Sequence, residues 1–149
     1  MKTADFFNRL NVMLFIAFFL TTASAIAQSA TSTDKRTVAP YHNLEIEGAF
    51  TVTLVQGDEE AVYIDATREL TEEVMIKADD GTLKIYTKKD SKTSGKVALT
   101  IYFKNLKSID CSGAILLTGT LSLDELSLDL SGACKATMEI HTASLHVDI

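Results

Sequence analysis

Three aspartates that recur at a fixed interval are the residues of this sequence with the clearest chemical potential. Asp110, Asp129 and Asp148 follow one another at an interval of 19 residues. If these positions lie on neighbouring strands, their carboxylates stand about 4.8 Å apart and repel one another. Each carboxylate could accept backbone N–H bonds at a neighbouring turn, or the row could form a recognition surface or a weak Ca²⁺ site. The regular spacing favours the structural interpretation over a catalytic carboxylate pair.

Cysteine and histidine give no signature of a metal centre or an active site. Cys111 and Cys134 are 23 residues apart, so they fall out of register with the 19-residue interval. We interpret them as two core-lining thiols, with a disulfide as the alternative in an exported protein. His42, His141 and His146 are too scattered for a zinc site, and the sequence has no nucleophile elbow, phosphate loop or Cys-x-x-Cys. We therefore expect a protein without enzymatic activity, metal or cofactor.

The same 19-residue interval governs the sequence around the aspartates. Ser112-Gly113-Ala114 recurs as Ser131-Gly132-Ala133, and the apolar alternation of residues 126–130 recurs in residues 145–149. A short fixed period built from strands is typical of a solenoid, in which each coil buries its apolar row against the next. The glycine of each tripeptide permits a corner that a branched residue would strain.

Hydrophobic and polar residues alternate along most of the chain. Between residues 44 and 103, short alternating runs are separated by turn sequences. Further on, the alternation predicts that Leu128 and Leu130 are buried and that Ser127 and Asp129 are exposed. Only residues 67–73 have helical character, enough for one turn. The predicted fold is all-β: a single-domain β-solenoid, resembling a right-handed parallel β-helix, with coils of about 19 residues. The alternative is an antiparallel β meander or sandwich.

The first 27 residues carry the pattern of a secretory signal peptide. Two basic residues precede the apolar run at residues 12–20, and Ala25-Ile26-Ala27 supplies small residues at the expected cleavage site. We predict cleavage before Gln28, because the apolar run is shorter than the roughly 20 residues of a spanning helix; an uncleaved anchor is the alternative. Residues 28–40 are small and polar, which predicts a flexible leader, and residues 41–149 form the folded domain.

The composition limits the possible functions. The 149 residues include 14 basic and 20 acidic side chains, which gives a formal net charge of −6. A net-acidic chain without a basic block is poorly suited to nucleic acid, because phosphate contacts need clustered lysine and arginine. No second apolar run is long enough to span a bilayer. The expected partner is therefore an envelope protein or a glycan.

The 19-residue repeat stops abruptly in this sequence. Residues 145–149 repeat the strand pattern but no further Ser-Gly-Ala follows. Solenoids commonly end in a capping unit with a polar outer face, and an uncapped strand edge invites pairing with another copy. We expect a C-terminally truncated copy of a longer repeat that can self-associate through its last coil.

Three segments carry a resemblance to a known family. They are residues 48–57 (GAFTVTLVQG), 80–86 (DGTLKIY) and 106–114 (LKSIDCSGA). In this order they resemble the head GIN domain family of autotransporter adhesins, which occurs largely in Bacteroidetes-type envelopes, over roughly residues 40–149. The resemblance implies a repeated β fold and a role in adhesion, with no catalytic residues to carry over. It also implies that family members usually continue through further Ser-Gly-Ala coils.

Together these features predict an exported, non-enzymatic, adhesin-like module of the cell envelope. Its repetitive strand surface would contact protein or glycan, and its location would be the periplasm, the outer-membrane surface or the medium. Two alternatives stay open. One is an enzyme that acts on polysaccharide, as some β-helical proteins do, and the other is a structural remnant without activity.

Overall fold

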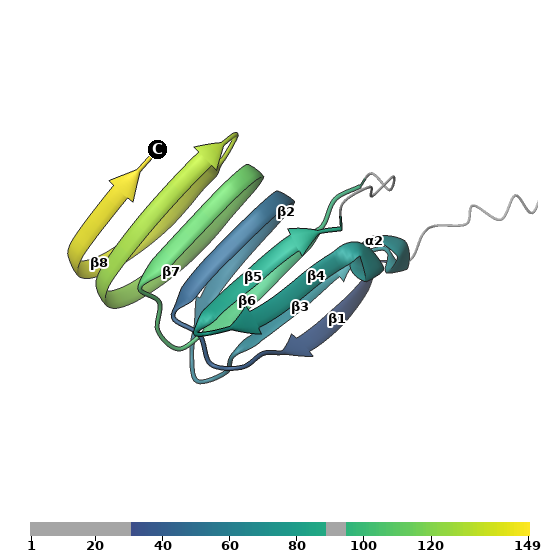
Figure 1. The fold of residues 1–149 in the computed structure, drawn as a ribbon, viewed down its shortest axis with the longest axis horizontal. Coiled ribbons are helices and arrows are strands. Elements are labelled where there is room, and N and C mark those ends of the chain that lie inside the picture. The colour runs from purple at the N-terminus through teal and green to yellow at the C-terminus, as the bar shows by residue number, and fades with distance from the viewer. Residues whose placement is uncertain (1–30, 89–94) are drawn as a thin grey trace, which may run out of the picture.

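The structure is a computed structural model that describes residues 31–88 and 95–149. The expected signal peptide, residues 1–27, lies outside the described residues. Within them, the chain forms an eight-stranded sheet and one short helix (Figure 1). The elements in chain order are β1 (Ser32–Thr37), β2 (Asn43–Gln56), β3 (Ala61–Ala66), α2 (Arg68–Glu73), β4 (Val74–Asp79), β5 (Thr82–Thr87), β6 (Ala98–Phe103), β7 (Ser108–Gly132) and β8 (Lys135–Asp148).

Strand β2 organises the sheet because it bends in its middle. Gly48, at the bend, has a φ of +139°, a conformation that residues with a side chain rarely adopt. Before the bend β2 pairs in parallel with β5, and after the bend it pairs in parallel with β6. Along both parts it also pairs in parallel with β7. The sheet therefore folds into two leaves that share β2 and β7 (Figure 1).

Different strands complete the two leaves. The first leaf continues from β2 through β5 to β4, and the second leaf continues from β2 through β6 and β3 to β1. The pairs β4–β5, β3–β6 and β1–β3 are antiparallel. The sheet is therefore mixed, and it curves into an open half-barrel (Figure 1). Its apolar side chains form a core on the inside.

The predicted parallel β-solenoid is wrong as a description of this chain. Alternating hydrophobicity places successive side chains on opposite faces in parallel and antiparallel pairs alike, so it does not reveal the direction of pairing. Here β4 and β5 form an antiparallel hairpin whose turn contains Asp80 and Gly81, both with positive φ. The alternative antiparallel meander fits only in part, because β2, β5, β6, β7 and β8 are joined by parallel pairs.

Among the described residues, the 19-residue interval is found only within β7 and between β7 and β8, where the pairing is parallel. Strand β7 bends back along itself: the N–H of Ser127 donates to the carbonyl of Lys107 at 2.8 Å, and the N–H of Ala133 donates to the carbonyl of Gly113 at 2.7 Å. These bonds place residues that are 19 apart side by side. Strand β8 then pairs in parallel with β7 at the same interval.

One apolar core lies between the leaves. Leu128 and Leu130 are 4% and 8% exposed, while Ser127 and Asp129 face solvent, as the alternation predicts. The core thins toward β8, where Val147, one repeat beyond Leu128, is 44% exposed. Within the described residues, no further strand pairs with β8 on its outer edge. The largest fully buried side chains are Tyr41, Phe103, Leu44, Ile46, Ile64, Leu83, Ile85, Leu99, Ile101, Leu106, Ile109 and Ile115.

Part of the expected flexible leader is a strand. Residues 32–37 form β1, which pairs antiparallel with β3. The guanidinium of Arg36 donates to the carbonyls of Val74 at 2.8 Å and Thr71 at 3.0 Å, which ties β1 to the neighbourhood of α2. Helix α2 agrees with the single turn predicted for residues 67–73. No helix in the described part of the chain has the length and apolar character needed to cross a membrane.

Candidate functional site

Four carboxylates form one row on the outer face of the first leaf. Asp148 lies opposite Asp129 in the β7–β8 register, and Asp110 lies opposite Glu45 in the β2–β7 register. Asp110 and Asp129 are side by side because β7 folds back at the 19-residue interval. The three aspartates are exposed and Glu45 is half-buried. The 19-residue interval indicated a row of three aspartates, and the structure adds Glu45 to this row.

Two lysines continue this row on the other side of Glu45. Lys84 lies opposite Glu45 in the β2–β5 register, and its ammonium is 2.7 Å from the Glu45 carboxylate. Lys77 lies opposite Lys84 on β4, with its Nζ 5.6 Å from the centre of the Tyr86 ring. These contacts raise the pKa of both lysines, that of Lys84 mainly through Glu45 and that of Lys77 mainly through the Tyr86 hydroxyl. The row therefore changes sign between β5 and β2.

The acidic half of the row is only partly compensated. Desolvation raises the pKa of Asp110 above its ordinary value, the charges of Asp129 and Glu45 raise it further, and Lys84 opposes them. Among the described residues, no backbone N–H donates to the carboxylates of the three aspartates, so the turn-capping interpretation has no contact in its support. Within residues 31–88 and 95–149, no three His, Cys, Asp or Glu side chains converge as metal ligands.

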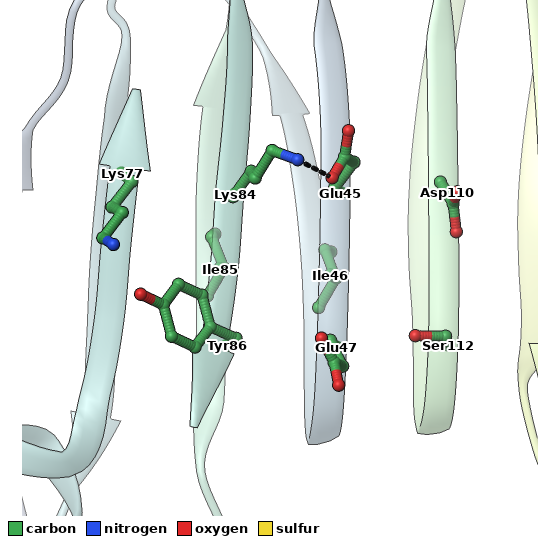
Figure 2. Close-up of a pocket in the computed structure, with 9 residues that line it drawn as sticks. All are labelled: Glu45, Ile46, Glu47, Lys77, Lys84, Ile85, Tyr86, Asp110 and Ser112. Atoms are coloured by element: carbon green, nitrogen blue, oxygen red, sulfur yellow. Dashed lines mark ion pairs between the residues drawn. The ribbon is translucent and has the colours of Figure 1, made fainter. Parts of the chain in front are cut away.

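A second polar row lies two residues further along the strands. Tyr86, Glu47 and Ser112 face one another across β5, β2 and β7. Between the two rows runs a groove of about 410 Å³ that is open to solvent (Figure 2). Ile46 and Ile85 lie beneath it with their side chains buried in the core. The groove is lined by Glu45, Ile46, Glu47, Lys77, Lys84, Ile85, Tyr86, Asp110 and Ser112.

Three glycines, one from β2 and two from the Ser-Gly-Ala corners, stack beside the groove and permit close approach of the strands. Gly48, Gly113 and Gly132 adjoin one another and have φ values of +139°, +116° and +85°. A Cβ on Gly113 would overlap the carbonyl oxygen of Gly48, and a Cβ on Gly132 would lie 2.8 Å from the carbonyl oxygen of Gly113. Only glycine permits this approach. Ser112 of the first corner lines the groove.

Sequence reasoning missed the groove residues that come from β2, β4 and β5. A signal for the two glutamates existed, because residues 44–49 (LEIEGA) follow the same apolar-acid-apolar-x-Gly-Ala order as residues 109–114 (IDCSGA). These two segments are paired residue by residue in the sheet. Lys84 and Tyr86 carried no such signal, because only the pairing of β5 with β2 brings them to the groove.

Cys111 and Cys134 are free thiols near the same corners, in agreement with the prediction of two thiols and not a disulfide. Burial raises the pKa of Cys111 to about 12, and the neighbouring thiol and carboxylate add to the effect. The half-buried thiol of Cys134 donates to the carbonyl of Ser131 at 3.1 Å. The raised pKa keeps the Cys111 thiol neutral, and a neutral thiol is a weak nucleophile. The histidines are exposed at separate places on the surface: His42, His141 and His146.

Comparison with known proteins identifies relatives of the fold. The family model described as "Putative auto-transporter adhesin, head GIN domain" matches residues 40–149. A solved structure of a putative adhesin from Bacteroides fragilis has a TM-score of 0.74 and 16% identity, covering 79% of this chain and 57% of that one. A putative lipid binding protein from Parabacteroides distasonis has a TM-score of 0.62 and 14% identity, covering 81% and 61%. A putative adhesin from Parabacteroides merdae has a TM-score of 0.60 and 19% identity, covering 81% and 59%.

These comparisons differ in what they establish. At identities of 14–19%, the similar structures show the fold alone, and this chain spans 57–61% of their length. Curated proteins give no match. The family match, in contrast, extends over residues 40–149, which include all of the groove and both corners. The chain therefore belongs to the family described as "Putative auto-transporter adhesin, head GIN domain".

Proposed function

We propose that this chain is an exported, adhesin-like module of the cell envelope that contacts a glycan or a protein and performs no catalysis. The observation that carries the proposal is the outer face of the first leaf, where a groove of about 410 Å³ separates two polar rows. Membership of an adhesin head-domain family and the adhesins among the similar structures support the adhesin-like role.

The groove suits recognition because strand pairing positions its side chains. Adjacent members of each row come from neighbouring strands, and every residue lies in a continuous register. Sites built on paired strands hold side chains more precisely than sites built on loops. The ion pair between Lys84 and Glu45 further limits the motion of two lining side chains. A face of this kind offers charged and hydroxyl groups to a partner without any rearrangement.

The same face is poorly suited to hydrolysis by a carboxylate pair. Glycosidases need a general acid with a raised pKa beside a second carboxylate. Asp110 has a raised pKa, yet its side chain is exposed, and the groove beside it is open. An open groove does not exclude water from a reacting bond. These features support a binding function.

The proposed location follows from the N-terminal sequence and the family. Residues 1–27 have the pattern of a cleaved signal peptide, which directs the chain out of the cytoplasm. Membership of a family described as auto-transporter adhesins supports an exported location. The periplasm, the outer-membrane surface and the medium are the three compartments that this export allows.

Adhesion of matched charge variants tests the proposal. Beads coated with the purified chain are placed on surfaces that carry mucin, mixed envelope glycans or envelope protein, and the beads retained under flow are counted. Asp110→Asn combined with Asp129→Asn neutralises two carboxylates of the acidic row and makes the net charge more positive by two, the same change as in the control. Thr53→Lys combined with Thr118→Lys adds two lysines at exposed, paired positions of the second leaf and serves as the control.

We expect the chain to adhere to at least one surface, the acidic-row variant to lose adhesion, and the control to retain it. Absence of adhesion on every surface, or equal adhesion by all three proteins, would contradict the proposal. A panel of acidic and neutral polysaccharides tests the second part of the proposal. Turnover of any polysaccharide would show that the protein is an enzyme.

A further inference from the structure

We infer that the groove between the two polar rows is a binding site for a short, neutral oligosaccharide. This inference rests on the proposed function and names the class of ligand that the groove accepts. The volume of about 410 Å³ falls within the ~300–1,000 Å³ that small-molecule sites occupy. The groove also crosses four strands, β4, β5, β2 and β7, so it spans about 14 Å at three strand spacings of about 4.8 Å. An elongated ligand therefore fits better than a compact one.

The lining presents hydrogen-bond donors at one end and acceptors at the other. Lys77 and Lys84 supply ammonium donors from β4 and β5, whereas Glu47 and Asp110 supply carboxylate acceptors from β2 and β7. Ser112 can donate and accept. A sugar hydroxyl is both a donor and an acceptor, so a saccharide satisfies both ends of the groove with the same functional group. Figure 2 shows these side chains projecting from the four strands on one face.

The charge pattern disfavours a charged ligand. Three carboxylates line the groove, those of Glu45, Glu47 and Asp110, and they repel an anion. Two ammonium groups, those of Lys77 and Lys84, repel a cation. Lys84 is already paired with Glu45 at 2.7 Å, so a charged ligand would also compete with an existing ion pair. A neutral ligand avoids both repulsions and leaves this ion pair intact.

Tyr86 supplies the apolar contact that sugar rings require. Its ring is half-buried and projects from β5 toward β4 beside Lys77 (Figure 2). The Lys77 ammonium lies 5.6 Å from the ring centre, a cation–π distance that holds the ring in place. An aromatic ring with a polar tip packs against an apolar surface while its hydroxyl keeps a polar partner. The C–H face of a sugar matches this surface, while the hydroxyls at its edge meet the polar rows.

Titration with oligosaccharides of different charge tests the inference. The probes are maltotriose, cellotriose and mannotriose as neutral ligands, trigalacturonate as the anion and the glucosamine trimer as the cation. Binding to the purified chain is followed by calorimetry and by the amide signals of Glu47, Tyr86 and Ser112 in two-dimensional NMR spectra. Tyr86→Ala removes the ring and Tyr86→Phe retains it. Thr53→Ala, at an exposed position of the second leaf, is the matched control.

We expect at least one neutral trisaccharide to shift the three amide signals and to bind at least tenfold more weakly to Tyr86→Ala than to Tyr86→Phe or Thr53→Ala. Tighter binding of trigalacturonate or of the glucosamine trimer would overturn the inference, as would neutral binding that Tyr86→Ala leaves unchanged. Absence of binding by every neutral trisaccharide would also overturn it. In that case, bead adhesion that is lost with the acidic-row variant would still support the proposed function, so the two failures are distinguishable.

Discussion

Alanine at Gly113 would disturb a close contact between the backbones of β2 and β7. The added Cβ would overlap the carbonyl oxygen of Gly48 and lie 3.1 Å from the Gly48 nitrogen and carbonyl carbon. All three atoms belong to the backbone of β2, which cannot turn aside as a flexible side chain could. Gly113 also has a φ of +116°, where a residue with a side chain is strained. The substitution therefore combines backbone strain with overpacking.

The two effects together are large compared with the stability of a domain. A side chain held in a sparsely populated backbone region costs about 1–3 kcal/mol, and overpacking a close contact costs about 1–3 kcal/mol more. We expect Gly113→Ala to lower the free energy of unfolding by about 2–6 kcal/mol, against a typical total of about 5–15 kcal/mol. Gly132 has a φ of +85°, and a Cβ there would lie 2.8 Å from the carbonyl oxygen of Gly113. Gly132→Ala should therefore lower the free energy of unfolding somewhat less than Gly113→Ala.

Urea denaturation measures this effect directly. Tyrosine fluorescence and far-ultraviolet circular dichroism follow unfolding, because the chain has 4 tyrosines and no tryptophan. With a slope of about 2 kcal/mol per molar urea, the expected loss moves the midpoint of Gly113→Ala down by about 1–3 M. Gly57→Ala is the matched control, because its Cβ would meet no heavy atom within 4 Å. If the midpoints of Gly113→Ala and Gly57→Ala agree, the close contact of Gly113 with the backbone of Gly48 does not limit the stability of the domain.

Three further outcomes are expected. Leu128→Ala should lower the free energy of unfolding by about 2–5 kcal/mol, whereas Ser127→Ala should change it by no more than about 0.5 kcal/mol; equal urea midpoints would contradict the inward and outward assignment. Asp110→Asn should raise the free energy of unfolding at neutral pH by at most about 1 kcal/mol, because the side chain is exposed, and the thermal midpoint should rise accordingly. Since folding raises the pKa of Asp110, the native state binds more protons between the unfolded and folded pKa values, and stability rises as the pH falls through that window. The gain from Asp110→Asn should therefore shrink toward acid pH in a series of thermal melts, and a gain that grows there would contradict the stated cause. Finally, the amide of Val147 should exchange with deuterium faster than that of Leu128, because β8 pairs on one edge only within the described residues; equal protection would show that the outer edge of β8 is covered.

Local patterns in the sequence predicted the strands and the direction of many side chains. The alternation that placed Leu128 inward and Asp129 outward requires only that the segment is a strand, because side chains of every strand alternate between faces. The 19-residue interval was also informative, since it fixed which residues of β7 and β8 lie opposite one another. In both cases the information lies within a few residues or within an exact repeat.

The sheet order could not be predicted, because it depends on contacts between segments far apart in the chain. Asn43 pairs with Thr82 on one side, and this pairing leaves no repeated motif that fixes its register. On the other side it pairs with Ser108, where the similarity of residues 44–49 to residues 109–114 was a signal that lay outside the 19-residue interval. A repeat in one part of the chain was extended to the whole chain, which produced the solenoid. Residues 32–37 were also misjudged, because a polar edge strand such as β1 has a composition similar to that of a flexible leader.

The candidate site likewise contains residues that the repeat predicted and residues that only long-range strand pairing brings together. Asp110 and Ser112 were singled out from the repeat, and both line the groove. Tyr86 and Lys84 come from the β4–β5 hairpin, which interrupts the repeated pattern and joins the site only through parallel pairing of β5 with β2. A groove between side-chain rows exists only after strands from different parts of the sequence are aligned. Its charge pattern could not be predicted without the register.

The acidic row combines a small cost to the fold with an unused capacity for hydrogen bonding. Exposed like charges on neighbouring strands destabilise a sheet by only about 0.2–1 kcal/mol per pair, so a sheet with a continuous core tolerates them. Lys84 compensates the row at Glu45, but desolvation and the neighbouring charge of Asp129 still disfavour the ionised form of Asp110. A ligand hydroxyl that donates to Asp110 would stabilise that ionised form and lower its pKa. Folding raises the pKa of Asp110, whereas the proposed ligand would lower it. Occupation of the groove would therefore offset part of the electrostatic cost that folding imposes on this carboxylate.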